Sequence, residues 1–355
     1  MSSKYKVVVV GMGKRGMHHA QAFQANGRFE VVGVCDVNRA RLDAAAAKFG
    51  AARGTDALRV ALETKPDVFC FCTLPNLRSE MIRAGIQSSA RLIAFEKPVA
   101  LNTREGFAVR KLLAENGVKA MVSHQHRYGE HYRKVKEIID SGTLGHVHTV
   151  YGTGPGWMMH LISHLIDYTR WYNGESPAQW VMGQAAGRGK LRDLHPSPDY
   201  IGGFIQFANG VRGVVECGAG APDVPEVDYW WRKCRIRAQG TEGFAEVLTG
   251  GGWRAVTKAG VSSGSGCMNY DLDMPPYIQE MADWLDDDRK IHSCNFESAY
   301  AGFEIMMALC RSAVNGGQVA LPLTEAAEEV EMMKEHLSHR KVLLSSPVNA
   351  KEYGQ

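Results

Sequence analysis

The chain lacks the features that mark several large classes of proteins. It has 355 residues, and none of its eight cysteines forms a CxxC pair or a zinc-knuckle spacing, so we expect no disulfide framework. No stretch approaches the roughly 18 uninterrupted apolar residues of a membrane span. Its 41 Lys and Arg are scattered and nearly balanced by 38 Asp and Glu. That balance predicts no nucleic-acid or membrane partner and favours a small-molecule substrate.

The N-terminus also lacks a targeting signal. Its apolar run is the four valines at residues 7–10, which is shorter than a signal-peptide core. Together with the unpaired cysteines, this predicts a cytoplasmic protein. A composition of 45% hydrophobic and 22% charged residues is that of an ordinary globular protein, and the length suggests about two domains.

Glycine, by contrast, is abundant, and the first glycines form a motif. The motif, Gly11-Met12-Gly13-Lys14-Arg15-Gly16, follows a β-branched run at residues 6–10 and opens a helical pattern that ends near Asn26-Gly27. A second apolar run, residues 30–35, ends at Asp36, about 20 residues after the third glycine. This order of strand, glycine turn, helix, strand and acid predicts a dinucleotide-binding site.

Each glycine of the motif has a mechanical role in that prediction. Gly11 permits the tight turn, Gly13 lets the backbone approach the pyrophosphate, and Gly16 allows the helix to pack closely on the strand. The helix N-terminus offers free N–H groups to the phosphates. The alternative is a glycine-rich turn that only packs.

Asp36 decides which dinucleotide is expected. Its carboxylate can accept hydrogen bonds from the ribose hydroxyls and would repel a 2′-phosphate, which favours NAD over NADP. Lys14, Arg15 and Arg39 lie close enough in sequence to leave NADP as the weaker alternative.

Strands and helices continue to alternate after this unit. Strands are expected at residues 67–72, 91–95 and 118–122, and helices at residues 39–49, 77–87 and 104–115. The alternation predicts an α/β fold with a doubly wound parallel sheet. Cys70 and Cys72 share one face of a strand, and we interpret them as small core residues rather than a metal or redox pair.

Glu96-Lys97-Pro98 follows the strand at residues 91–95, at the edge of the sheet where open α/β folds bind their ligands. With the dinucleotide motif upstream, this tripeptide resembles the second signature of the glucose-fructose oxidoreductase, inositol dehydrogenase and rhizopine-catabolism family (Gfo/Idh/MocA). Four further segments are similar to the motifs of that family: Thr73-Leu74-Pro75-Asn76, Val122 to Tyr128, Ser141 to Val147, and His160 to Asp167. The chain departs from the family at Ser79 and His160, where His and Asp are usual.

The resemblance implies a Rossmann domain over residues 1–122 and an α+β domain over residues 123–355 with a large, mainly antiparallel open sheet. The active site would lie in the cleft between the domains, and the bond before Pro98 would be cis. A hairpin over residues 203–216 resembles the centre of the second sheet. An apolar sheet face without helices predicts a homodimer or homotetramer.

The same resemblance, with the dinucleotide motif, supplies the expected cofactor contacts. They are Gly11, Met12, Gly13, Lys14, Arg15, Gly16, Asp36, Thr73, Pro75, Asn76, Glu96, Lys97 and Gln125.

The expected chemistry involves two side chains. Removing a hydride from a secondary alcohol leaves a protonated carbonyl unless the hydroxyl proton also leaves, so a base must reach that oxygen. His164 is the candidate because imidazole titrates near neutrality. Lys97 would donate to the same oxygen as an ammonium, or act as the base if desolvation lowers its pKa. The sequence leaves both assignments open.

Four residues are predicted to contact the substrate: His160, Asp167, Arg127 and Trp157. Asp167 could also orient the His164 ring, and Trp157 could stack on a sugar or simply pack in the core. His160, His164 and Asp167 could alternatively bind a metal, but HxxxH is common by chance and we expect none. The Pro-rich segment at residues 194–200 is either a loop over the cleft or a surface connection.

These residues predict an NAD-dependent dehydrogenase or reductase that acts on a CH–OH group of a sugar, sugar derivative or cyclic polyol. One alternative is an NAD-assisted glycoside hydrolase or eliminase, in which a transient keto-sugar forms and the hydride returns. Another is a non-catalytic NAD-binding regulator, although such a protein would have no need of Lys97 and His164.

Overall fold

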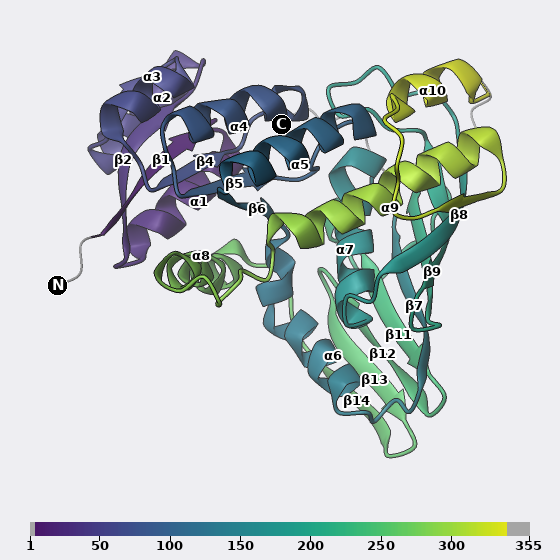
Figure 1. Ribbon diagram of the computed structural model, residues 1–355. Helices are drawn as coiled ribbons and strands as arrows, with labels where there is room; N and C mark the ends of the chain where they lie inside the picture. Colours follow the sequence, from purple (N-terminus) through teal and green to yellow (C-terminus); the bar gives the residue numbers. More distant parts are fainter. Residues whose placement is uncertain (1–3, 339–355) are drawn as a thin grey trace. The chain divides into compact units, whose positions relative to one another are not determined.

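The computed structural model describes residues 4–338, and the chain divides into two compact units. The first unit contains the chain up to Leu101, Glu105–Tyr128 and Asn269–Ala299, and the second contains Asn102–Arg104, Gly129–Met268 and the chain from Tyr300. Each unit has its own sheet (Figure 1). The chain therefore returns to the first unit late in the sequence.

The first unit contains a six-stranded sheet, all parallel, in the order β3-β2-β1-β4-β5-β6. The strands are β1 (Tyr5–Val10), β2 (Phe29–Cys35), β3 (Ala52–Gly54), β4 (Val68–Phe71), β5 (Leu92–Glu96) and β6 (Lys119–Ser123). The last four residues of β1, all valine, and the whole of β4 are apolar and buried, as expected for strands covered on both faces of the sheet. The strand order reverses between β1 and β4, and open α/β sheets bind ligands at the carboxyl ends of strands at such a point.

The helices of this unit are α1 (Lys14–Ala25), α2 (Arg39–Phe49), α3 (Ala57–Thr64), η1 (Pro75–Leu77), α4 (Arg78–Gln87), α5 (Thr103–Asn116), η2 (Gln125–Tyr128) and α8 (Tyr270–Asp286). α8 packs on α1, and its residues Met274, Tyr277, Ile278 and Met281 join the apolar core around β1. The predicted strands and helices of the first 122 residues are present, and β3 and α3 are additional.

The second unit contains a nine-stranded sheet in the order β14-β13-β12-β11-β7-β10-β9-β8-β15. The strands are β7 (Val147–Gly154), β8 (Ala178–Ala186), β9 (Tyr200–Phe207), β10 (Arg212–Gly218), β11 (Arg235–Gly240), β12 (Gly243–Leu248), β13 (Gly252–Thr257), β14 (Gly260–Gly264) and β15 (Gln318–Ala320). Neighbouring strands in this sheet are antiparallel, except β7 and β10, which are parallel. β9 and β10 form the predicted hairpin, with Gly210 at φ +84° in its turn. The predicted fold class is confirmed.

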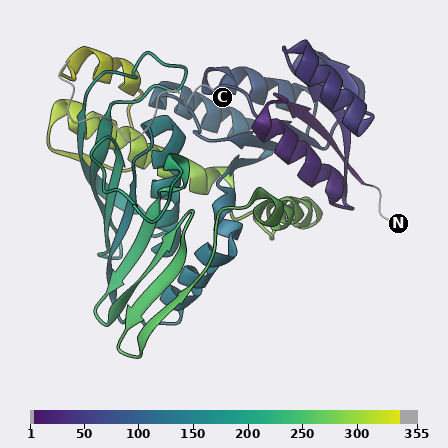
Figure 2. The same ribbon diagram turned by 180° about the vertical axis from the view of Figure 1, so that it is seen from behind.

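Helices cover one face of this second sheet. α6 (Glu130–Asp140) packs on β12 and β13, and α7 (Ser163–Tyr172) packs on β7, β10 and β11. α9 (Phe296–Asn315) crosses β8 so closely that a Cβ on Gly183 would lie 2.4 Å from the carbonyl oxygen of Leu309. Seen from behind, the strands stand in front of α7 and α9, and no helix of residues 4–338 lies over them (Figure 2).

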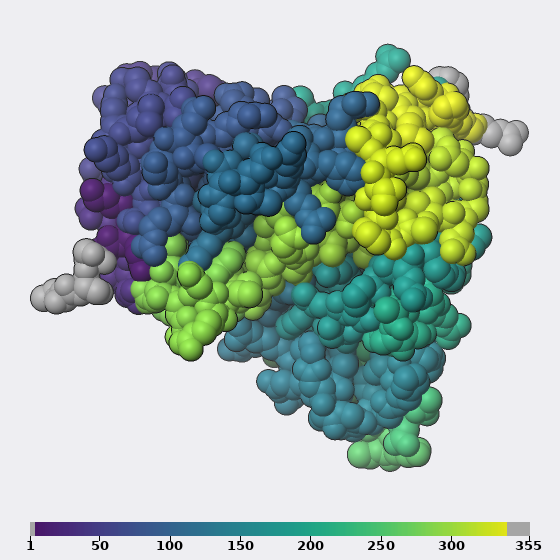
Figure 3. Space-filling view, viewed as in Figure 1, coloured from purple at the N-terminus to yellow at the C-terminus, as the bar shows by residue number. Residues whose placement is uncertain are grey.

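The last described helix, α10 (Glu329–His336), lies beside the C-terminal half of α9 (Figure 3, yellow). Its Glu329 carboxylate is buried and lies 2.8 Å from Arg311 Nη2, and it accepts from the Thr103 backbone N–H at 2.8 Å. The remaining short turns are η3 (Met158–Ile162) and η4 (Trp230–Arg232). None of the helices in the described part of the chain combines the length and apolar composition that a bilayer span requires.

Candidate active site

The glycine turn between β1 and α1 has the geometry of a dinucleotide-binding turn. Gly11 has φ +85°, and a Cβ on Gly16 would lie 1.8 Å from the Gly11 carbonyl oxygen, so both positions require glycine. At Gly13 the nearest atom to such a Cβ would be the Arg41 guanidinium at 3.7 Å. The space over Gly13 is therefore open, and no side chain caps the N-terminus of α1 there. These residues fit a pyrophosphate.

Asp36, directly after β2, holds the turn from the other side. Its Oδ2 accepts from the Met12 backbone N–H at 2.6 Å, and its Oδ1 accepts from the Asn38 N–H at 2.7 Å. The carboxylate is 7% exposed. Each oxygen keeps a further lone pair, so the carboxylate can still accept from ribose hydroxyls. Lys14 lies exposed at the first position of α1.

Arg15 turns away from the glycine turn and contacts the end of β5. Its Nε donates to Glu96 Oε1 at 2.9 Å, and its guanidinium carbon lies 4.3 Å from the ring centroid of Tyr270. His19 Nε2 lies 3.1 Å from the same Glu96 oxygen. Burial would raise the pKa of Glu96, but Arg15, His19 and Lys97 outweigh it and hold that pKa well below its usual value.

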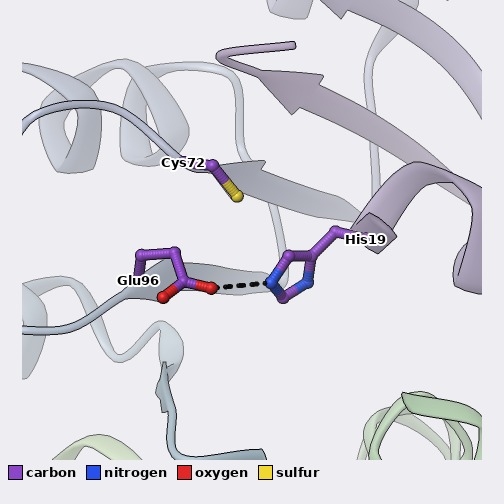
Figure 4. A group of neighbouring side chains, drawn as sticks. All are labelled: His19, Cys72 and Glu96. Atoms are coloured by element: carbon purple, nitrogen blue, oxygen red, sulfur yellow. Dashed lines mark hydrogen bonds and ion pairs between the residues drawn. The ribbon is translucent and has the colours of Figure 1, made fainter. Parts of the chain in front are cut away.

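His19, Cys72 and Glu96 form a potential metal-ligand group at this place. One ligand atom of each lies within 4.8 Å of the others, and Figure 4 shows the His19 ring and the Glu96 carboxylate meeting beside the Cys72 thiol. The Arg15 guanidinium already occupies the Glu96 oxygen that faces His19. A metal ion here would lie beside the Arg15 cation and be repelled by it, so the arrangement favours an ion-paired cluster over a metal site.

Cys70 and Cys72 were interpreted from the sequence as core residues, and Cys70 is fully buried. The Cys72 thiol beside it lowers the pKa of Cys70, with His19 contributing. Burial of the His19 ring lowers its pKa, but Cys70 and Glu96 outweigh this and raise it overall. The thiols therefore belong to the same cluster as Glu96.

Lys97 follows β5 in a turn whose Lys97-Pro98 peptide bond is cis, as expected. Its packed surroundings lower the pKa of the ammonium, Arg15 and Arg78 lower it further, Glu96 opposes them, and the result is about 8. Lys97 can therefore both donate and accept a proton near neutral pH.

The turn after β4 contains Thr73, Pro75 and Asn76, and here the structure adds a residue that the sequence did not single out. Pro75 is buried at the first position of η1, and Asn76 is exposed. Arg78, at the start of α4, is 0% exposed and donates to the carbonyl oxygens of Glu96 and Thr73 at 2.6 and 3.3 Å. Arg78 therefore joins the two turns that contain the predicted cofactor contacts.

Gln125 and Arg127 lie in η2, directly after β6, and both are buried. Gln125 Oε1 accepts from the Ser123 hydroxyl at 3.0 Å. Arg127 donates to the Ser293 carbonyl oxygen at 3.1 Å.

In the second unit, the predicted histidine motif begins in a π-helical turn, η3, and continues into α7. The His160 ring lies 4.0 Å, centroid to centroid, from the ring of His195, which comes from the Pro-rich segment at residues 194–200. Residues four apart share a face of an α-helix, but a π turn closes i→i+5 hydrogen bonds, so the HxxxH spacing alone does not place His160 and His164 on one face.

His164 lies on the first turn of α7, and its Nδ1 is 3.1 Å from the Tyr168 hydroxyl. The two rings stack at 22°. Tyr168 is one helical turn along, so its hydroxyl is placed to help orient the ring. Asp167 is buried on the same helix. Trp157 is also buried, and the Lys190 ammonium lies 5.0 Å from its ring centroid.

A parallel sheet with a glycine turn at its switch point and an acid after β2 defines a dinucleotide-binding oxidoreductase. The family model described as an oxidoreductase family with an NAD-binding Rossmann fold matches residues 5–124, and the Gfo/Idh/MocA C-terminal domain model matches residues 151–246. The chain belongs to the Gfo/Idh/MocA family of oxidoreductases, and its first unit contains that family's NAD-binding Rossmann domain.

Among similar proteins, the inositol 2-dehydrogenase of Rhizobium meliloti is 25% identical over 222 residues, which are 58% of this chain and 66% of that protein. The match thus spans slightly less than two thirds of that relative. The D-glucoside 3-dehydrogenase of Escherichia coli is 24% identical over 241 residues, 59% of this chain and 68% of that protein. The solved structure of the WlbA dehydrogenase from Bordetella pertussis, in complex with NADH and UDP-GlcNAcA, has the same fold, with a TM-score of 0.72, 20% identity, and coverage of 91% of this chain and 99% of that one.

Proposed function

We propose that this oxidoreductase uses NAD to oxidise or reduce a secondary alcohol or ketone of a sugar, sugar derivative or cyclic polyol. The first unit binds the cofactor, and all proposed substrate contacts except Arg127 come from the second unit. NAD, when bound, supplies the hydride acceptor or donor. Asp36 binds the ribose hydroxyls and disfavours a 2′-phosphate, and the open space over Gly13 receives the pyrophosphate.

The observation that carries the proposal is the setting of Lys97. An ammonium held at the carboxyl end of β5, with a pKa lowered to about 8, can donate to the reacting oxygen in one direction and accept in the other. Such a group is not required for binding a dinucleotide. It favours an enzyme over a non-catalytic NAD-binding regulator.

His164 is the second proton carrier of the proposal. The Tyr168 hydroxyl lies 3.1 Å from its Nδ1 and helps to orient the imidazole, which then exchanges the substrate proton. His160, Asp167, Arg127 and Trp157 are proposed as substrate contacts.

The substrate class follows from two relatives, one named for inositol and one for a D-glucoside. The test follows absorbance of reduced nicotinamide with purified protein, NAD and NADH across a panel of inositols, aldoses, glucosides and their keto forms. We expect turnover with at least one member and a preference for NAD. Tight NAD binding without turnover on the whole panel would contradict the proposal.

A glycoside-cleaving function is the second candidate. The pair of His160 and His195 provides two imidazoles at one place, and a transient keto-sugar would need a further base beside its acidified carbon. A chromogenic glycoside separates the two functions. Release of the chromogenic alcohol with no net change in reduced nicotinamide would favour cleavage, and accumulation of NADH would favour the dehydrogenase.

We also propose that the second sheet pairs with another copy of the chain, as a homodimer or homotetramer. Gly203 faces α9, so Phe204 beside it points to the opposite face, where it is 57% exposed. Met182, its cross-strand partner on β8, is 48% exposed. Two large apolar side chains side by side on a sheet face favour a protein interface.

A further inference from the structure

Arg78 is a buried cation whose contacts are unusual. Its Nη2 donates to the carbonyl oxygens of Glu96 at 2.6 Å and Lys97 at 3.3 Å, its Nε donates to Pro98 at 3.0 Å, and its Nη1 donates to Thr73 at 3.3 Å. Among the described residues, its hydrogen bonds all go to backbone carbonyl oxygens. One side chain thereby binds the backbone of two separate loops.

Two aromatic rings hold the guanidinium in place. Its carbon lies 5.5 Å from the ring centroid of Phe71, on β4, and 5.4 Å from that of Phe95, on β5. These rings stack on each other at 5.1 Å with an angle of 2°. The planar guanidinium is therefore fixed by packing as well as by hydrogen bonds.

A fully buried guanidinium without a carboxylate partner is costly, because its charge is removed from water and balanced by carbonyl dipoles. Burial lowers the pKa of Arg78 to about 10, which still leaves it charged at neutral pH. Packing alone would be served better by an apolar side chain. The geometry thus indicates that Arg78 holds the two loops in their observed conformation.

We propose that Arg78 is a positioning residue, which ties the Lys97 turn to the Thr73 turn and so fixes the Lys97 ammonium relative to the cofactor. This inference rests on the proposed function, in which Lys97 transfers the proton. Lysine cannot replace arginine here, since an ammonium lacks the planar fork that reaches several carbonyl oxygens at once.

The proposal also predicts a change in the pKa of Lys97, because Arg78 is one of the charges around it. Glu96 raises the pKa of Lys97, and Arg15 and Arg78 lower it. The cluster beside Glu96 also contains His19, Cys70 and Cys72, each of which interacts with the Glu96 carboxylate. Removing the Arg78 charge should therefore raise the pKa of Lys97 toward that of an ordinary lysine.

The experiment compares Arg78→Ala and Arg78→Lys with Ile82→Ala, a control that truncates another buried side chain of α4. For each protein we would measure urea unfolding, kcat against pH on the substrate identified by the panel, and kcat with added guanidinium ion. Arg78→Ala and Arg78→Lys should lose about 100-fold in kcat. Guanidinium should restore part of the loss in Arg78→Ala, whereas Ile82→Ala should lose stability and keep its kcat.

Two results would overturn the inference: wild-type kcat and pH profile in Arg78→Ala, or equal kcat losses in Ile82→Ala and Arg78→Ala with no rescue by guanidinium. A further measurement distinguishes failure of this inference from failure of the proposed function. Competitive acetylation, read on the Lys97 peptide by mass spectrometry, gives the pKa of Lys97 without any turnover. An unchanged pKa in Arg78→Ala contradicts the positioning role, while wild-type kcat in Lys97→Met contradicts the proposed function.

Discussion

At the residue scale, the charged groups beside β5 determine the pKa of Lys97. Glu96 alone would stabilise the ammonium strongly, but Arg15 neutralises that carboxylate at 2.9 Å. Burial and the guanidinium groups of Arg15 and Arg78 then bring the pKa of Lys97 to about 8. A proton carrier with a pKa close to the working pH transfers protons well in both directions.

Tyr168→Phe tests the partner of His164. Loss of the hydroxyl removes the hydrogen bond that helps to orient the ring, so kcat should fall about five- to tenfold, the equivalent of ~1 kcal/mol. NADH affinity, measured by fluorescence titration, should not change. Tyr172→Phe is the control, because it removes a buried hydroxyl that donates to the Tyr132 carbonyl oxygen. Equal effects of both variants on kcat would argue against an orienting role.

His292 makes the stability of the first unit sensitive to pH. Burial lowers its pKa to about 4, and its Nδ1 accepts from the Cys294 N–H, so the ring is neutral when folded. The unfolded histidine titrates near its ordinary value of 6.5 and gains a proton below that pH. Folding stability is therefore lost as pH falls from about 6.5 toward 4.

The His292→Gln variant removes this dependence. Its free energy of unfolding should lie below that of the wild type at pH 7.5, and the gap should narrow by about 2 kcal/mol between pH 6.5 and 5. Urea unfolding of both proteins at pH 7.5, 6.5 and 5 measures this difference in the free energy of unfolding. A gap that stays constant would show that His292 takes up its proton equally in both states.

The sequence identified site residues that are part of a motif and missed those whose partners lie elsewhere. Asp36 lies at a fixed spacing after the glycine motif, and Lys97 lies within the Glu-Lys-Pro motif, so the places of both in the fold could be predicted. Arg78 has no such signature, because its partners are backbone carbonyl oxygens that any residues could supply. The sequence predicts that His195 lies in a loop but not that it contacts His160, since that contact depends on tertiary structure.

At the element scale, long apolar segments were predicted well and short ones were not. β1 contains a run of four valines, residues 7–10, and α2 has the predicted bounds Arg39–Phe49. β3, with the sequence Ala-Arg-Gly, has no β-branched residue to mark it as a strand. The π turn of η3 has no sequence signal either, because the apolar residues around His160 fit an α-helix equally well.

Asp36, directly after β2, offers a test of cofactor choice. Asp36→Ser removes the ribose acceptor and the charge that opposes a 2′-phosphate, so NAD affinity should fall ten- to a hundredfold while NADP affinity rises. Asp43→Asn, an exposed change on α2, is the matched control. Fluorescence titration with NADH and NADPH gives both affinities. An unchanged ratio would exclude Asp36 from cofactor selection.

At the scale of the whole molecule, each unit combines distant parts of the chain. α8 follows β14 of the second sheet but completes the core of the first unit, and α9 begins in the first unit and ends in the second. Hydrophobic periodicity predicts such helices but not the core that they join, because any apolar face of suitable size could be covered.

Phe204→Glu tests the proposed interface. A carboxylate in the middle of an apolar contact would be desolvated without a partner, so the variant should sediment as a monomer at micromolar concentration while the wild type sediments as a dimer or tetramer. Leu62→Glu, an exposed apolar residue on α3, should leave the assembly unchanged. A wild-type monomer, or a Phe204→Glu protein that still assembles, would contradict the interface.

The central claim is that Lys97 transfers the proton that accompanies the hydride. Its most direct test is a single-turnover measurement of reduced nicotinamide against pH for the wild type and Lys97→Met, with NAD affinity measured in parallel. We expect an apparent pKa near 8 in the wild type. In Lys97→Met we expect a rate lower by about 10²–10⁴-fold, the loss of that titration, and unchanged NAD affinity. A Lys97→Met protein with the wild-type rate and pH profile would contradict the account.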